Sequence, residues 1–252
     1  IETQAANGVI DVRVDGDAEA VDAAKRLLGY FQGPLPDSAW EEPDPQHARD
    51  VIPERRRRAY DVHRAIEAIA DVGSITTLRD GFGPTMVTAL ARIEGRAVGI
   101  VANNPMQMGG AITSDGSDKA ARFMQLCDAF GIPVVSLIDT PGMMVGPDAE
   151  ATGLVRHCSR LFLTGANLRV PLVAVVLRKA YGLGAQAMAG GGMHEPLLTV
   201  GWPTAELGAM GLEGAVRLGA RRELDAIEDP QEREAKVQEM TAALHDHAKG
   251  LN

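Results

Sequence analysis

The sequence is poor in the residues that build disulfides, metal sites and basic surfaces. Its six histidines are scattered without metal-ligand spacing and no CxxC or HExxH motif occurs, so we expect no metal site. The net charge of -9 argues against a nucleic-acid partner, which would require a basic surface. The two cysteines, Cys127 and Cys158, are expected to be reduced thiols on apolar helix faces, as is typical of a cytoplasmic protein.

Long apolar runs are missing as well. No run reaches the roughly 18 residues that a transmembrane helix needs, and no signal peptide is visible, so we expect no membrane partner. The 252 residues, 45% of them hydrophobic, are enough to bury a substantial core in one large domain or two small ones. Because the chain begins with Ile1 and not with methionine, we expect that it is cut from a longer protein.

No familiar arrangement of catalytic side chains stands out. His157 and Cys158 are adjacent, so on a helix they would point about 100° apart and could not act as a pair. Asp-Thr-Pro-Gly at 139–142 matches the DxxG element of GTPases, but the chain has no GxxxxGK[ST] phosphate loop. Residues 182–187 match G-x-G-x-x-A, which keeps a dinucleotide-binding oxidoreductase domain as an alternative. The next strand, however, ends at 200–202 without an acidic residue for a ribose hydroxyl.

Apolar strands that alternate with helices are the main pattern that is present. The sequence predicts strands at 8–12, 74–79, 85–93, 97–103, 134–138, 172–176 and 197–200, and helices at 22–28, at 60–71 and after Pro230. Two further helices are predicted from apolar stripes made of Phe123, Met124, Cys127 and Phe130, and of Leu154, Val155, Cys158, Leu161 and Phe162. Strands that are continuously apolar are buried on both faces, so we expect an α/β fold with mostly parallel pairing.

A proline-rich stretch separates two parts of the chain. Five prolines lie within residues 33–59 among few apolar neighbours, which predicts a linker that crosses a surface without packing. The residues after Pro230 are charged and are expected to form a helical tail.

Two glycine-containing turns are the strongest functional signal. Residues 139–142 and 180–184 each follow an apolar run opened by a proline, and each is expected to open a helix. Backbone N–H groups exposed at such a turn can hold a developing oxyanion or a phosphate. The amides of Leu183 and Gly184 are the candidates for such a pair. A tight turn with a purely structural role is the alternative at this point.

Several segments around these turns resemble a known family. They are residues 60–62, 95–105, 119–123, 138–142, 178–182 and 210–215. Together they resemble the carboxyltransferase (beta) component of biotin-dependent acyl-CoA carboxylases, a member of the crotonase superfamily. The resemblance covers nearly the whole chain and is strongest from about 58 to 219. It implies the crotonase-like (ClpP/crotonase) fold, a spiral of ββα repeats.

The resemblance also implies a division of the chain. Residues 1–33 would be a remnant of the N-terminal carboxyltransferase half, 34–59 a linker, and 60–252 the C-terminal, crotonase-like half, which provides the biotin side of the site. The implied reaction is carboxyl transfer from carboxybiotin to the α-carbon of an acyl-CoA. Backbone N–H groups would stabilise the biotin enolate, and the fragment alone is expected to be inactive. A family decarboxylase subunit, or a non-catalytic oligomerisation module, is an alternative.

Site residues and partners follow from the same resemblance. Leu183 and Gly184 would be the catalytic amides. The expected biotin-binding residues are Asn103, Thr140, Gly142, Met143, Tyr181, Gly182 and Gln186. Many acetyl- and propionyl-type members have an aspartate near the acyl group in this stretch, whereas this chain has Gln186, so the identity of the acyl group stays open. No biotinylation motif is present, so biotin would arrive on a partner domain or subunit and not be bound covalently to this chain. The expected partners are acyl-CoA, the N-terminal half, the biotin carboxyl carrier, biotin carboxylase and further copies of the chain.

Overall fold

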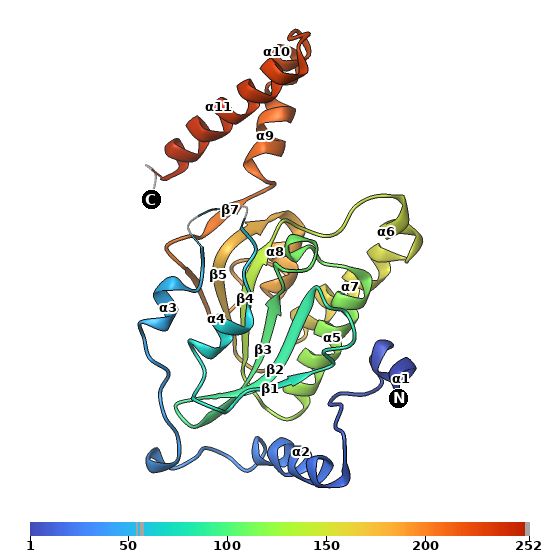
Figure 1. Cartoon of the computed structure of the whole chain (residues 1–252), viewed down its shortest axis with the longest axis vertical. Helices are drawn as coiled ribbons and strands as arrows, with labels where there is room; N and C mark the ends of the chain where they lie inside the picture. Colours follow the sequence, from blue (N-terminus) through green and yellow to red (C-terminus); the bar gives the residue numbers. More distant parts are fainter. Residues whose placement is uncertain (54, 56–57, 250–252) are drawn as a thin grey trace. The chain divides into compact units, whose positions relative to one another are not determined.

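A mixed β-sheet organises the first part of the chain in the computed structural model, which describes residues 1–53, 55 and 58–249 (Figure 1). Its main path runs β1-β2-β3-β4-β5-β6. The strands are β1 (Thr76–Leu78), β2 (Met86–Ile93), β3 (Arg96–Asn103), β4 (Val134–Thr140), β5 (Leu172–Tyr181) and β6 (Leu198–Gly201). β1, β2 and β3 pair antiparallel, whereas β3, β4, β5 and β6 pair parallel. The α/β prediction with mostly parallel pairing is confirmed for the stretch after β3.

Both faces of this sheet are covered, as the apolar runs predicted. On one face, α5 (Ser114–Ala129) and α7 (Leu154–Ala166) pack over strand residues such as Val101 and Ile138. On the other face, Ile100 and Leu137 belong to a second core that includes residues from the stretch 51–70. Neighbouring residues of one strand therefore enter different cores, because successive side chains of a strand point to opposite faces.

The helical stripes are confirmed for most of their members. Phe123, Met124 and Cys127 are buried on α5, and Leu154, Cys158 and Leu161 are buried on α7. Phe130 and Val155 were predicted to share these stripes, but both are exposed. Phe130 follows the last residue of α5 and packs instead on Phe31, with ring centroids 4.7 Å apart. Val155 lies off the face that its neighbours at spacings of three and four residues define.

The segment before β1 differs most from the prediction. It contains α1 (Glu2–Ala6), α2 (Asp17–Gly29), η1 (Asp37–Ala39), α3 (His47–Asp50) and α4 (His63–Glu67). The predicted helix at 22–28 lies within α2, but the predicted strand at 8–12 does not form. Gly8 there has a φ of +76°, which interrupts an extended backbone, and Val9 is exposed. The predicted helix at 60–71 is shortened to α4 at both ends. It starts late because the Asp61 carboxylate accepts the N–H of His63 and forms a turn first, and turn residues follow its last residue at 68–69.

The proline-rich stretch packs more than was predicted. Val51 and Ile52 are buried in the second core, so the expectation of an unpacked surface linker is wrong for them. Glu54, Arg56 and Arg57 lie outside the described residues. The division at 34–59 stays a prediction.

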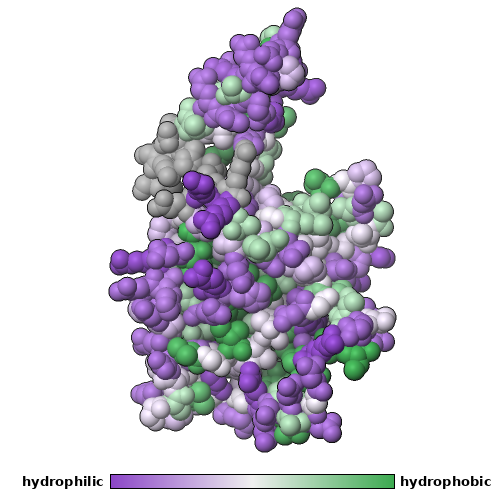
Figure 2. All heavy atoms as spheres, viewed as in Figure 1, coloured by the Kyte–Doolittle hydropathy of each residue, from purple (hydrophilic) through white to green (hydrophobic). Residues whose placement is uncertain are grey.

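Residues 1–206 form one compact unit, and residues 207–252 form another. The second unit contains α9 (Leu212–Gly219), α10 (Arg221–Asp225) and α11 (Pro230–Lys249). The short strand β7 (Glu206–Gly208) lies at the border between the two ranges. The predicted helix after Pro230 is confirmed. The small core of this unit contains Val216, Leu224 and Val237, and the surface of α10 and α11 that is visible in Figure 2 is mostly hydrophilic.

Candidate active site

The ends of three neighbouring strands bring most predicted site residues together. Asn103 ends β3, Thr140 ends β4 and Tyr181 ends β5, and all three are buried. The carboxyl ends of parallel strands lie at the same edge of a sheet, where α/β folds commonly bind ligands. The Asn103 Oδ1 atom accepts the N–H of Asp139 at 3.1 Å, so β3 is tied to β4 next to Thr140. The Tyr181 hydroxyl donates to the Glu206 carboxylate at 2.6 Å.

The two glycine turns that the sequence singled out meet at this edge. A Cβ atom placed on Gly184 would lie 2.7 Å from Cα of Gly142 and 3.2 Å from N of Met143. No ordinary side chain fits at such distances, so the contact requires glycine at position 184. Gly142 has a φ of +130°, which also requires glycine. The Thr140 hydroxyl holds this turn, because it accepts the N–H of Gly142 at 3.1 Å and donates to its carbonyl at 3.0 Å.

The first turn does not open a helix, contrary to the prediction. The next helix, α6 (Pro147–Ala151), begins only after several further residues. The intervening segment pairs with residue 112 in the manner of a strand. The N–H of Ile112 donates to the Gly142 carbonyl, and the N–H of Met144 donates to the Ile112 carbonyl. The backbone groups of this segment are thus satisfied by a neighbouring loop, and the positive φ of Gly142 is incompatible with a helix start.

The second turn does open a helix, as predicted. α8 (Gly182–Met188) follows Tyr181 directly. The first N–H groups of a helix have no partner within the helix. The N–H groups of Leu183 and Gly184 donate to no backbone carbonyl outside α8 in the part of the chain that the structure describes. Gly184 is buried, while the side chains of Leu183 and Gln186 are exposed. Gln186 is the predicted residue for which the structure gives no contact with the strand ends.

A buried ionic cluster lies beside the site and was not assigned a role from the sequence. The Asp139 carboxylate is fully buried and contacts Arg178 and Lys179, both within 3.0 Å. The Arg178 guanidinium lies over the Tyr60 ring, 5.0 Å from its centroid. Burial, and next the nearby Asp139 carboxylate, raise the pKa of Tyr60, so its hydroxyl stays protonated at neutral pH. The sequence signal for this cluster was the adjacent pair Arg178 and Lys179, which follows the apolar run 172–177.

Exposed apolar side chains occur on the segments that follow the strand ends of the site. Met106, Met108, Val145 and Leu183 are all more than half exposed. They belong to the loop after β3, the loop after β4 and the start of α8, the segments that carry the predicted site residues. Exposed apolar side chains in a group are more informative than single ones, because they point to a ligand or partner surface. In the remainder we refer to these four residues as the apolar rim.

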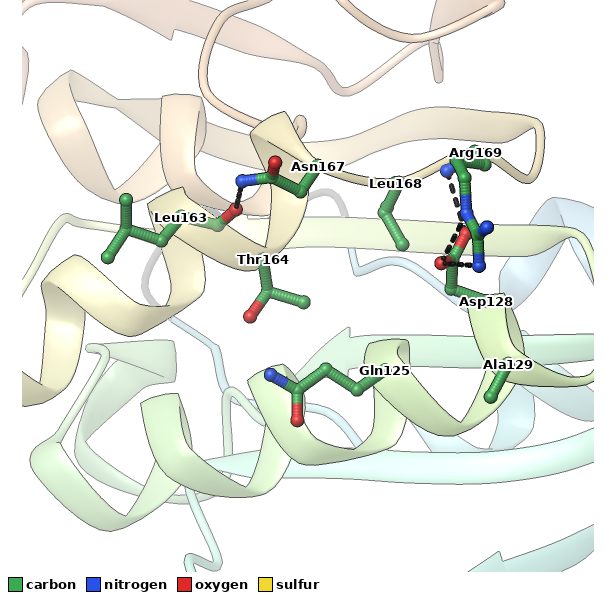
Figure 3. Close-up of a pocket in the computed structure, with 8 residues that line it drawn as sticks. All are labelled: Gln125, Asp128, Ala129, Leu163, Thr164, Asn167, Leu168 and Arg169. Atoms are coloured by element: carbon green, nitrogen blue, oxygen red, sulfur yellow. Dashed lines mark hydrogen bonds and ion pairs between the residues drawn. The ribbon is translucent and has the colours of Figure 1, made fainter.

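Elsewhere the described residues contain a cavity, but no candidate metal site and no helix that could span a membrane. No group of three or more His, Cys, Asp or Glu that could hold a metal occurs within residues 1–53, 55 and 58–249. No helix found in those ranges is long and apolar enough to cross a membrane. A cavity between α5 and α7 is lined by Gln125, Thr164, Asn167 and the Asp128–Arg169 ion pair, among others (Figure 3). None of the predicted site residues lines it.

Comparison with known families gives a match over almost the full length. The pattern of the carboxyl transferase domain family matches residues 2–249. A propionyl-CoA carboxylase carboxyltransferase subunit from Haloferax mediterranei is 36% identical over 234 residues, which are 90% of this chain and 45% of that protein. An acetyl-/propionyl-CoA carboxylase beta6 subunit from Mycobacterium tuberculosis is 38% identical and covers 97% of this chain and 51% of that protein. The chain thus spans about half the length of the curated relatives it matches.

Solved structures show the same fold. A single-chain, multi-domain long-chain acyl-CoA carboxylase matches with a TM-score of 0.91 and 52% identity, covering 98% of this chain and 24% of that chain. The hexameric transcarboxylase 12S, with methylmalonyl-CoA bound, matches with a TM-score of 0.81 and 36% identity, covering 96% of this chain and 48% of that chain. These structures confirm the predicted crotonase-like α/β fold.

Proposed function

The chain belongs to the carboxyl transferase domain family, and we propose on that basis that it forms the biotin-side half of an acyl-CoA carboxyltransferase site. The structural observation that supports the proposal is the contact between the Gly142 turn and Gly184, beside the N–H groups that begin α8. A dinucleotide-binding oxidoreductase was the alternative for the glycine pattern at 182–187. The family match favours the carboxyltransferase instead.

The site fits a small, neutral ring that becomes negatively charged on one oxygen. Two adjacent N–H groups, from Leu183 and Gly184, are available in the first turn of α8. Gly184 lets the backbone of the Gly142 loop come within contact distance of the start of α8. Both N–H groups are hydrogen-bond donors, as the ureido oxygen of biotin requires.

The residues of this chain act by binding and orientation. When bound, carboxybiotin supplies the carboxyl group that is transferred. The amides of Leu183 and Gly184 donate to the oxygen on which negative charge develops, and they cost no reorganisation because the helix holds them in place. Thr140 and Asn103 fix the loops around them through the hydrogen bonds described above. No side-chain acid or base is needed for this role, which agrees with the lack of a catalytic triad in the sequence.

The remaining predicted residues extend this site. We propose that Met143, Tyr181 and Gly182 line the biotin position, since they adjoin Gly142 and Gly184 in the chain or in contact. Gln186 lies on the exposed side of α8, where it can reach an acyl group brought by a partner. The apolar rim supports a long aliphatic acyl chain as substrate, in agreement with the name of the 52% identical carboxylase.

The proposal includes partners that must complete the site. The acyl-CoA side would come from the N-terminal half, and biotin from a carrier domain loaded by a biotin carboxylase, since the relatives extend to about twice the length of this chain. Assembly into a homo-oligomer is proposed by analogy with the hexameric transcarboxylase. Both cysteines are free thiols, which supports a cytoplasmic location.

The experiment measures transfer of labelled carboxylate from carboxybiotin to acetyl-, propionyl- and palmitoyl-CoA by the full-length protein that contains this chain. We expect transfer, with palmitoyl-CoA preferred. Gly184→Ala should lower kcat about 10²-fold, because its Cβ would collide with Gly142 and displace the amides. Gly29→Ala is the matched control, since an added Cβ there meets nothing within 4 Å. Absence of transfer by the wild-type protein, or equal rates for both variants, would refute the proposal.

A further inference from the structure

The Asp139 carboxylate on β4 makes four contacts with two residues of β5. Its Oδ2 atom accepts from Nε of Arg178 at 3.0 Å, and Nη2 of the same residue lies 3.0 Å from it. Its Oδ1 atom accepts the backbone N–H of Lys179 at 3.2 Å and lies 2.8 Å from Nζ of Lys179. All four contacts reach consecutive residues of β5, so one side chain of β4 holds two residues of the next strand.

The residues that Asp139 holds form an irregularity in β5. Ile138 pairs with Val176, but Thr140 pairs with Ala180. The β4 strand therefore advances by two residues while β5 advances by four. The two extra residues must bulge out of the ladder, and Arg178 and Lys179 lie in this interval. We refer to residues 177–179 as the β5 bulge.

The bulge determines where α8 begins. Ala180, Tyr181 and Gly182 follow directly after it. Because the bulge takes up two residues, Ala180 lies opposite Thr140, and α8 begins two positions earlier along β4 than an even ladder of the same residues would place it. On the β4 side, Thr140 and the Gly142 turn follow Asp139 in the same way. The last pair between β4 and β5, Thr140 with Ala180, therefore comes directly after the contacts of Asp139. The two chain segments that meet at Gly142 and Gly184 begin just beyond this pair.

Further contacts fix Asp139 itself. Its N–H donates to the Asn103 side chain, and a Cβ on Gly110 would lie against its carbonyl oxygen. Arg178 is held by Asp139 and also donates to the Arg58 carbonyl at 2.8 Å. Two cations face one carboxylate in a buried place, so loss of the carboxylate charge would leave both without a counter-ion and drive them apart.

We propose that Asp139 is a positioning residue, which holds the β5 bulge in place and thereby sets the spacing between the Gly142 turn and the amides of α8. It acts through Arg178 and Lys179 and does not touch the substrate. The hold of Asp139 on the β5 bulge is inferred from the contacts above, and its effect on carboxyl transfer rests on the proposed function.

The test compares Asp139→Asn with the wild type in the full-length protein. The substitution keeps the shape and one acceptor of the side chain and removes its charge. Hydrogen exchange, measured by mass spectrometry on the peptide segment 177–188, should become about tenfold faster while the exchange of β2 and β3 is unchanged. Under the proposed function, kcat for carboxyl transfer should fall about 10²-fold with KM for acyl-CoA little changed, because the amides move and the acyl-CoA side is supplied elsewhere.

Asp128→Asn is the matched control. The Asp128 carboxylate also accepts a backbone N–H and an arginine side chain, both of Arg169, but it lies away from the site residues. It should change neither the exchange of 177–188 nor kcat. If Asp139→Asn does not fold, Lys179→Ala replaces it, since Lys179 is partly exposed and its loss should loosen the same segment less strongly.

The outcomes separate this inference from the proposed function. Unchanged exchange at 177–188 in the variant overturns the positioning role, even if the wild type transfers carboxyl groups. Faster exchange confined to that segment supports the role, even if the wild type shows no transfer and the proposed function fails. A fall in kcat with unchanged exchange also contradicts the role, because it would then arise without movement of α8.

Discussion

At the scale of single residues, Lys119 is a charged side chain that is almost fully buried. It lies on the inner face of α5 with 2% of its surface exposed. Burial lowers the pKa of its ammonium group to about 8; the Asp80 carboxylate opposes this shift and Arg79 adds to it. A buried cation with so little compensation destabilises the folded state as long as it stays protonated.

The pH dependence of stability should reveal this cost. Below pH 8, Lys119 is protonated in both states, so the folded state carries the full penalty. Between about pH 8 and 10.5 the folded state has lost this proton while the unfolded state keeps it, so the free energy of unfolding rises with pH. Lys119→Met should therefore be more stable than the wild type by about 1–3 kcal/mol at pH 7, and the difference should shrink towards pH 10.

Urea unfolding of both proteins from pH 7 to 10 measures this difference. The buried phenol and thiol groups, including Tyr30 and Cys127, titrate in both proteins and cancel in the comparison. A difference that stays constant with pH would show that the burial cost of the ammonium group is not its source.

Residues 142 and 184 show what the sequence could and could not reveal at this scale. Their turns were identifiable because each follows a buried apolar run, and α8 begins where expected. That the two turns touch depends on strand order and on the β5 bulge, neither of which a local pattern encodes. For the same reason Asp139 could be quoted as part of a motif but not assigned its contacts with Arg178 and Lys179.

At the scale of elements, the β2–β3 hairpin combines a strained turn with a dedicated side-chain anchor. Glu94 and Gly95 connect the strands with φ values of +50° and +72°. Both residues are thus in the conformation of a type I′ turn, for which Asn-Gly is preferred. The buried Asp71 carboxylate accepts the N–H groups of Glu94 and Gly95, at 2.9 and 2.8 Å. The anchor keeps glutamate in a backbone conformation that it rarely adopts.

Glu94→Asn should therefore stabilise the protein. Asparagine tolerates the left-handed conformation better than glutamate, so we expect a gain of about 0.5–1 kcal/mol in the free energy of unfolding. Thermal unfolding followed by circular dichroism measures it. Glu94→Gln is the control, because it removes the charge without easing the backbone, and it should leave the stability nearly unchanged. An equal gain in both variants would assign the effect to charge.

The predicted strands formed where the run has a partner strand, including the short β1 and β6, and the one at 8–12 did not form. The strands from β2 to β5 have seven or more residues each, and their runs located them within a few positions. The short run at 8–12 has no partner strand, and the backbone of residue 11 instead accepts the N–H of Arg79. Periodicity reports that residues can be buried, whereas strand pairing decides whether they are.

At the scale of the whole molecule, Arg92 joins the N-terminal segment to the sheet within the first unit. This buried guanidinium donates to the carbonyls of Gly29, Gly33 and Gly95. The Tyr30 ring packs on it, with the guanidinium 5.7 Å from the ring centroid. Residues at the end of α2 are therefore part of the same packed body as β2 and β3, in agreement with the range of the unit.

Arg92→Leu should release the N-terminal segment. Three carbonyls would lose a charged donor, which should cost about 2–4 kcal/mol in the free energy of unfolding. Limited proteolysis should become faster within residues 13–35, while cleavage within the parallel strands stays slow. Arg96→Leu at an exposed position of the same hairpin is the control. Equal proteolysis of the two variants would show that Arg92 does not hold the segment.

The irregular pairing between β4 and β5 has a consequence for anyone who redesigns this protein. An even ladder would look like an improvement by the usual standards of sheet design, and deletion of two residues from the strand would restore one. The following helix would still start opposite the same residue of the neighbouring strand, but at least one of the two cations that face the buried carboxylate would be lost with the deleted residues. A transplant of this site to another scaffold must therefore copy the defect in the sheet together with the glycines.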